Sequence, residues 1–150
     1  MFWARVDNRL VHGQIIETWI PFTEARVLLV ANDELSRDVL KQEIMSLAIP
    51  GDVKALFTPV DRIMSLINTL EKSEVLVLFS SCGDARKAYE AGLDLAGINI
   101  GNLHYGPGKK QLCAHVALSV EDESCLRYFM NKGVELDFRC VPTEHIQVKF

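Results

Sequence analysis

The sequence predicts an α/β fold: a single-domain, open, twisted and mainly parallel sheet with helices on both faces and one antiparallel edge strand. Short runs that are apolar at every position, such as Val75–Phe79, are typical of strands buried on both faces. Segments with helical spacing of apolar residues alternate with these runs, as in parallel sheets. The 150 residues are 49% hydrophobic and contain no linker or repeat, so we expect one domain over residues 1–150.

The first half of the chain should form three strands and three helices. We expect strands over residues 1–6, 26–31 and 53–57, and helices over residues 11–20, 34–48 and 60–70. Pro50 and Gly51 stop the second helix, and Pro59 suits the first turn of the third. The second helix has apolar residues near helical spacing at Leu35, Val39, Leu40, Ile44, Met45 and Leu47.

The second half continues the alternation. We expect strands over residues 75–79, 96–100, 111–118 and 134–139, and helices over residues 85–91 and 120–131. Ser119 should cap the last helix, whose first turn is acidic, and Gly133 should end it in the left-handed conformation. Residues 101–108 are rich in turn formers and should be an irregular loop.

Composition excludes several classes of function. The net charge of −4 argues against a nucleic-acid partner, and no apolar run approaches the length of a membrane span. The four cysteines are far apart without a C-x-x-C pair, so we expect reduced thiols in a cytoplasmic protein and no metal site. The sequence lacks a Walker A motif and a G-x-G-x-x-G fingerprint, so it gives no support for ATP or dinucleotide binding.

A dense polar cluster over residues 5–14 lies where the first strand meets the first helix. The carboxyl ends of parallel strands share one edge of a sheet, so residues 7–14, 79–84 and 101–108 should line one cleft. Arginines and helix amides suit a phosphate or carboxylate, and His12 is able to accept and release a group at neutral pH. The candidate residues are Arg5, Asp7, Asn8, Arg9, His12, Gly13, Gln14, Ser80, Ser81, Asn102 and His104.

Structural explanations for the same residues remain open at this point. Asp7 and Asn8 could cap the helix, and Arg5 could pair with Asp7 as a local salt bridge. His12 could be a hydrogen-bonded structural residue, and His104 could order its loop rather than line the cleft.

The segment Arg5-Val6-Asp7-Asn8-Arg9-Leu10-Val11-His12-Gly13-Gln14, followed by Trp19, resembles a known N-terminal motif, R-[IV]-D-x-R-L-[IV]-H-G-Q. The motif belongs to the IIB component of the mannose/fructose/sorbose family of the bacterial phosphoenolpyruvate-dependent sugar phosphotransferase system. The segment 99–102 also resembles the N-[IV]-G loop of that family. One departure is Phe79-Ser80-Ser81-Cys82-Gly83, where a Lys/Thr/Ser-Pro type of segment is expected, so Ser80 or Ser81 would be only a hydroxyl donor.

The resemblance implies a protein-histidine phosphotransferase that needs no cofactor. His12 would take a phosphoryl group on Nδ1 from phosphorylated IIA and pass it to a sugar carried by the membrane subunits IIC and IID. Arg5 and Arg9 would steady the phosphoryl group, and Asp7 would shape the loop. Such a protein would be cytoplasmic and peripherally associated with the inner face of the membrane through the permease.

Two alternatives keep the same residues but change their use. The chain could be a regulatory phosphoprotein with the same His12 chemistry and no sugar transport, or a module that binds anions without covalent modification. The sugar and the oligomeric state stay open. We expect the IIA contact surface to surround His12, with Leu10, Val11 and Leu103 as candidates for an apolar rim, although each could equally belong to the core.

Overall fold

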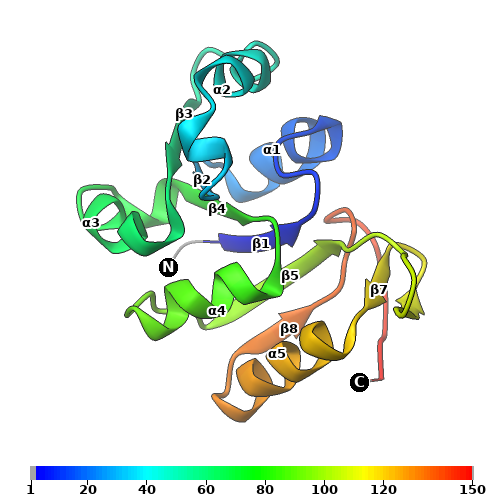
Figure 1. Cartoon of the computed structure of the whole chain (residues 1–150). Helices are drawn as coiled ribbons and strands as arrows, with labels where there is room; N and C mark the ends of the chain where they lie inside the picture. The colour runs from blue at the N-terminus through cyan, green and yellow to red at the C-terminus, as the bar shows by residue number, and fades with distance from the viewer. Residues whose placement is uncertain (1–2, 150) are drawn as a thin grey trace.

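The computed structural model describes residues 3–149 and contains a six-stranded sheet whose neighbouring strands are all parallel (Figure 1). The strand order is β3-β2-β4-β1-β5-β8. The strands are β1 (Trp3–Asp7), β2 (Val27–Ala31), β3 (Lys54–Thr58), β4 (Val75–Phe79), β5 (Gly97–Asn102) and β8 (Glu135–Asp137). The predicted mainly parallel α/β class is confirmed. Residues 1 and 2 of the predicted first strand lie outside the described residues.

The prediction of an antiparallel edge strand in this sheet is wrong. The edge strand β8 pairs parallel to β5, because the helix α5 (Val120–Asn131) carries the chain back before β8 begins. Antiparallel pairing occurs instead in a separate hairpin of β6 (Lys110–Cys113) and β7 (Val116–Leu118). This hairpin replaces the single strand predicted over residues 111–118.

Helical segments cover both faces of the sheet (Figure 1). Side chains of β4 alternate between two cores: Val77 and Phe79 enter one, and Leu76 and Leu78 enter the other. Every residue of β4 is buried, which explains its uninterrupted apolar sequence. Four helical segments pack into the core that contains Val77 and Phe79: η3 (Val60–Arg62), α3 (Ile63–Ile67), α4 (Cys82–Glu90) and α5. Three pack into the core that contains Leu76 and Leu78: the π-helical turn η1 (Ile15–Trp19), α1 (Ile20–Thr23) and the 3-10 turn η2 (Leu35–Arg37). A further 3-10 turn, η4 (Lys72–Glu74), leads into β4.

The helix predicted over residues 34–48 is divided in two. Asp38 leaves the helical conformation and caps α2 (Val39–Ser46) by accepting a hydrogen bond from the amide of Lys41. No residue of α2 is buried, and its apolar side chains Val39, Leu40 and Ile44 are 64%, 67% and 59% exposed. Helical spacing of apolar residues therefore marks an exposed face here, in contrast to its usual meaning.

The predicted ends of the last helix are confirmed. Ser119 and Asp122 form a reciprocal capping box at the start of α5, and Gly133 has a φ of +80° after its end. Only glycine adopts this left-handed conformation without steric cost.

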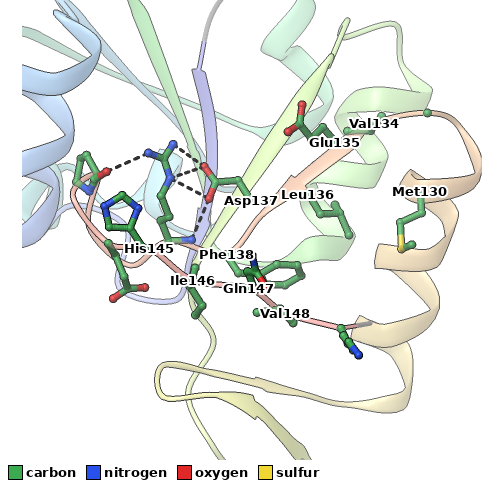
Figure 2. A pocket seen from close by; sticks show the side chains of 15 residues that line it. Met130, Val134, Glu135, Leu136, Asp137, Phe138, His145, Ile146, Gln147 and Val148 are labelled. Carbon is green, nitrogen blue, oxygen red and sulfur yellow. Dashed lines mark hydrogen bonds and ion pairs between the residues drawn. The ribbon is translucent and has the colours of Figure 1, made fainter.

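The segment over residues 138–149 contains no helix or strand. It runs beside β8, and the two enclose an open groove of about 1670 Å³ (Figure 2). Leu136, Ile146 and Val148 line this groove, and Asp137 accepts hydrogen bonds from Arg139 at its end. At its start this C-terminal segment reaches the residues that surround Arg5, described below.

Candidate functional site

Asp7, the last residue of β1, is the centre of the polar cluster and is fully buried. Its Oδ2 atom accepts hydrogen bonds from Nε and Nη2 of Arg5 at 3.2 and 3.1 Å. The same oxygen lies 2.7 Å from Nε2 of His12 and accepts from Nδ2 of Asn102 at 2.9 Å. Its Oδ1 atom accepts from the backbone amide of Arg9 at 3.0 Å. One carboxylate therefore joins β1, the loop after it and β5.

The environment of Asp7 keeps this carboxyl ionised. Burial alone would raise its pKa, but the hydrogen bonds from His12 and Asn102 and the positive charge of Arg5 oppose burial, and the pKa is lowered. An ionised carboxylate only accepts hydrogen bonds, so Nε2 of His12 must carry the proton. In a neutral imidazole, Nδ1 then holds the free lone pair, and no hydrogen bond to Nδ1 is found among residues 3–149.

The guanidinium of Arg5 lies inside the protein rather than in an open cleft. Besides Asp7, it donates to Oδ1 of Asn99 at 2.6 Å and to the carbonyl of Arg139 at 3.3 Å. Its Cζ atom lies 5.0 Å from the centre of the Trp19 ring. Burial lowers the pKa of Arg5, and Asp7 opposes this effect. The expectation that Arg5 contacts a phosphoryl group does not fit its exposure of 0%, because every direction open to the guanidinium is occupied by protein.

Arg9 has the opposite environment. It is exposed, and its guanidinium makes no hydrogen bond or ion pair within residues 3–149. Only its backbone amide is held, by Asp7. Of the two predicted arginines, Arg9 is the one that can reach an anion at the surface.

The loop after β1 is held from both sides. Asn8 donates to the carbonyl of Ser80 at 3.3 Å and accepts from the amide of His104 at 2.6 Å, so it joins the loops after β1, β4 and β5. Leu10 adopts a φ of +57°, which costs a non-glycine residue about 1–2 kcal/mol. Its side chain is buried in the second core, which holds this conformation in place.

The remaining predicted residues lie at different depths. Gly13 and His104 are exposed, and Gln14 accepts a hydrogen bond from Asn102 at 3.2 Å. Ser81 caps α4 by accepting from the amide of Asp84, which is a structural role. Of the two alternatives for Leu10, Val11 and Leu103, the core is correct and the apolar rim is wrong, because all three are buried in the two cores.

Sequence reasoning did not assign a role to several residues behind the cluster. Asn99 positions Arg5, and the indole of Trp19 donates to the carbonyl of Cys140 at 2.9 Å. The thiol of Cys140 donates to Oε1 of Gln14 at 3.4 Å. The partners in these three hydrogen bonds are 94 to 126 positions apart in the sequence, so local patterns could not predict them. The only signals for these residues in the sequence were the family resemblances at Trp19 and 99–102.

The cluster consists of one ionised carboxylate, one buried cation and one histidine with a defined tautomer. Within residues 3–149, no group of three or more His, Cys, Asp or Glu side chains is arranged to hold a metal ion. None of the helices in this part of the chain has the length and hydropathy needed to cross a bilayer. An imidazole whose Nδ1 atom makes no hydrogen bond within residues 3–149 can act as a nucleophile, and the exposed Arg9 belongs to the same loop.

Comparison with known proteins shows the family to which the chain belongs. The sequence matches the family described as "PTS system sorbose subfamily IIB component" over residues 1–148. The chain belongs to this family. It is 30% identical over 142 residues to the N-acetylgalactosamine-specific phosphotransferase enzyme IIB component 2 of Escherichia coli K12, covering 94% of this chain and 90% of that protein. It is 29% identical over 143 residues to the sorbose-specific EIIB component of Klebsiella pneumoniae, covering 94% and 87%.

Solved IIB structures share the fold of this IIB chain. The N-acetylgalactosamine-specific IIB component 1 of Escherichia coli superposes with a TM-score of 0.90 at 28% identity, covering 99% of this chain and 97% of that one. The IIBSor domain of the sorbose permease from Klebsiella pneumoniae gives a TM-score of 0.87 at 29% identity, covering 97% and 91%. The family confirms the resemblance found in the sequence.

Proposed function

We propose that this IIB chain is a phosphocarrier that accepts a phosphoryl group from phosphorylated IIA on Nδ1 of His12. It then passes the group to a sugar during uptake through the membrane IIC/IID permease, with residues 1–150 acting as one IIB domain. The observation that carries the proposal is the 2.7 Å contact between Nε2 of His12 and the ionised carboxylate of Asp7. This contact leaves Nδ1 as the nucleophilic atom of a neutral ring.

The first transfer needs no proton movement. The lone pair on Nδ1 of His12 attacks phosphorus, and a new N–P bond forms as the N–P bond of the donor phosphohistidine breaks. The electron pair of the broken bond returns to the donor ring. Because Nε2 keeps its proton, the carboxylate of Asp7 balances the charge of the phosphorylated ring.

In the second transfer, His12 is the phosphoryl donor and no longer the acceptor. A sugar hydroxyl oxygen attacks phosphorus, an O–P bond forms, the Nδ1–P bond breaks, and the hydroxyl proton is released to water. Sugar-specific names among the relatives, such as those for sorbose and N-acetylgalactosamine, support a sugar as acceptor.

IIA and the permease subunits are the proposed protein partners. The chain is 27% identical over 143 residues to the mannose-specific EIIAB component of Escherichia coli K12, covering 94% of this chain and 44% of that protein. The name of that relative joins a IIA and a IIB function, and a separate IIA would supply the same donor here. We propose that IIA docks on the exposed residues around His12, namely Asn8, Arg9, His104 and Tyr105.

Replacing Arg9 with alanine should slow phosphoryl transfer about 10²- to 10³-fold, because a charge-assisted donor to the transferring oxygens is lost. Stability should change by no more than about 0.5 kcal/mol, because the exposed side chain makes no hydrogen bond within residues 3–149. The measurement combines transfer kinetics with urea denaturation. Arg9→Lys is the control and should give an intermediate rate, since it keeps the charge but not the two-pronged geometry. An unfolded Arg9→Ala variant would instead make Arg9 a structural residue.

The direct test follows the phosphoryl group from phosphoenolpyruvate through enzyme I, HPr and a cognate IIA to this chain. Peptide mapping under alkaline conditions, which preserve phosphohistidine, should place an acid-labile and alkali-stable phosphate on the His12 peptide. Absence of this label with a competent donor would favour an anion-binding module. Labelling without transfer to any sugar in membranes containing the permease would favour the regulatory phosphoprotein.

A further inference from the structure

Gly101 lies in β5 at a position where an added side chain would collide with the guanidinium of Arg5. A β-carbon built on Gly101 would lie 1.9 Å from Cζ of Arg5, 2.1 Å from Nη2 and 2.4 Å from Nε. Such distances are far below van der Waals contact. Any residue other than glycine therefore requires the guanidinium to move.

The need for glycine here is a matter of space and not of backbone conformation. The φ of Gly101 lies outside the left-handed range, so an alanine could adopt the same backbone. This distinguishes Gly101 from Gly92, Gly108 and Gly133, whose φ values are positive. The sheet register explains the contact: Val6 pairs with Ile100 but Asp7 pairs with Asn102, so Gly101 is the extra residue of a β-bulge in β5, next to the strand that carries Arg5.

The guanidinium is held in its position by contacts on several sides. It is fully buried and bound to Asp7, Asn99 and the carbonyl of Arg139, with the Trp19 ring 5.0 Å away. If a side chain at 101 displaced it, Asp7 would lose two of the four hydrogen bonds that its Oδ2 atom accepts. The same oxygen binds Nε2 of His12, so displacement of Arg5 would alter the contact between Asp7 and His12 even though the new side chain does not contact His12.

We infer that Gly101 is a positioning residue for phosphoryl transfer. The absence of its side chain forms a slot that seats Arg5 against Asp7, and Asp7 in turn holds His12 with Nε2 protonated and Nδ1 free. The inference rests on the proposed function, since it assigns Gly101 a part in that reaction. Arg5 is likewise a positioning residue, which acts through Asp7 and not by touching the phosphoryl group.

Gly101→Ala should slow transfer to His12 about 10- to 100-fold, as expected when a reacting group loses its orientation. The distinguishing measurement is the long-range ¹H–¹⁵N correlation spectrum of the His12 ring. The wild-type ring should be in the Nε2–H form, and the variant should show a mixture with the Nδ1–H form. Gly97→Ala is the matched control in β5: its β-carbon would meet Glu135 at 3.3 Å and does not approach Arg5. It should keep the wild-type tautomer and rate whatever stability it loses.

A double-mutant cycle distinguishes a specific effect of position 101 on the Arg5 guanidinium from a general effect on packing. Glutamine at position 5 ends before the atoms that correspond to Cζ and Nη2, so it removes the two closest overlaps. If Gly101 serves the guanidinium, Arg5→Gln/Gly101→Ala should match Arg5→Gln alone within about twofold in rate. Should Gly101→Ala fail to fold, recovery of folding in the double variant supports the slot.

The inference about Gly101 is contradicted if Gly101→Ala keeps the wild-type tautomer of His12 and the wild-type transfer rate. It is also contradicted if Gly101→Ala slows transfer as much in the Arg5→Gln background as in the wild type. A double variant that does not fold, beside a folded Arg5→Gln, would also overturn it. The tautomer spectrum needs no phosphoryl donor, so it reports on the slot even if the proposed transfer reaction does not occur. Failure of the slot and failure of the proposed function are thereby distinguishable.

Discussion

Replacing His12 with glutamine should abolish incorporation of phosphate from phosphorylated IIA, while the fold is kept. Glutamine offers a hydrogen-bond donor that can reach the carboxylate of Asp7, now bound by Nε2 of His12. It has no nucleophilic nitrogen that could replace Nδ1. The measurement is the acid-labile label on the peptide that contains residue 12, together with a thermal unfolding curve.

His145 provides a matched control because it is exposed and lies in the C-terminal segment. His145→Gln should be labelled at the wild-type rate. Label that persists in His12→Gln would show that another residue carries the phosphoryl group. Retention of anion binding without label in both the wild type and the variant would favour the non-covalent module.

Replacing Asp7 with asparagine should slow transfer about 10²- to 10⁴-fold, the range expected when an acid–base partner or a tautomer is lost. The amide cannot balance the charge of a phosphorylated imidazole, and it no longer dictates which ring nitrogen of His12 carries the proton. It also leaves Arg5 as a buried cation without a counterion. Removal of one partner of a buried pair costs about 3–5 kcal/mol, which urea denaturation at neutral pH would measure.

The double variant Arg5→Gln/Asp7→Asn separates the two effects of Asp7. Because both buried charges are removed, stability should recover most of the loss, but transfer should stay slow. Equal recovery of both properties would mean that Asp7 acts only through the ion pair and not through His12.

The lowered pKa of Asp7 fixes the sign of the pH dependence of stability. A depressed carboxyl pKa stabilises the fold above the unfolded value of about 3.9, and this contribution is lost as the pH falls through the lower folded value. The stability difference between wild type and Asp7→Asn should therefore be present above the unfolded pKa of the carboxyl and shrink in strong acid. A difference that grows on acidification would contradict the ionised state of Asp7.

Local patterns predicted much of this protein from the sequence. The apolar run of β4, the Ser119 cap and the left-handed Gly133 each depend on residues two to four positions apart, which a sequence displays directly. The histidine motif was equally visible, because its spacing lies within one strand-to-helix junction. The family resemblance assigned it to a IIB component, and the match over residues 1–148 confirmed that family.

Only the tertiary structure decided how the polar residues divide their roles. Arg5 and Arg9 look equivalent in the sequence, but β5 lies beside β1 in the sheet, and it buries Arg5 against Asn99, 94 residues away. For the same reason Asn102 donates a hydrogen bond to Asp7, although the two residues are 95 positions apart in the sequence. The slot at Gly101 also exists only because β1 and β5 are neighbours in the sheet. Local spacing determines which elements form, but strand order determines which side chains from distant segments meet, and in this chain that order places Asn99 against Arg5 and Asn102 against Asp7.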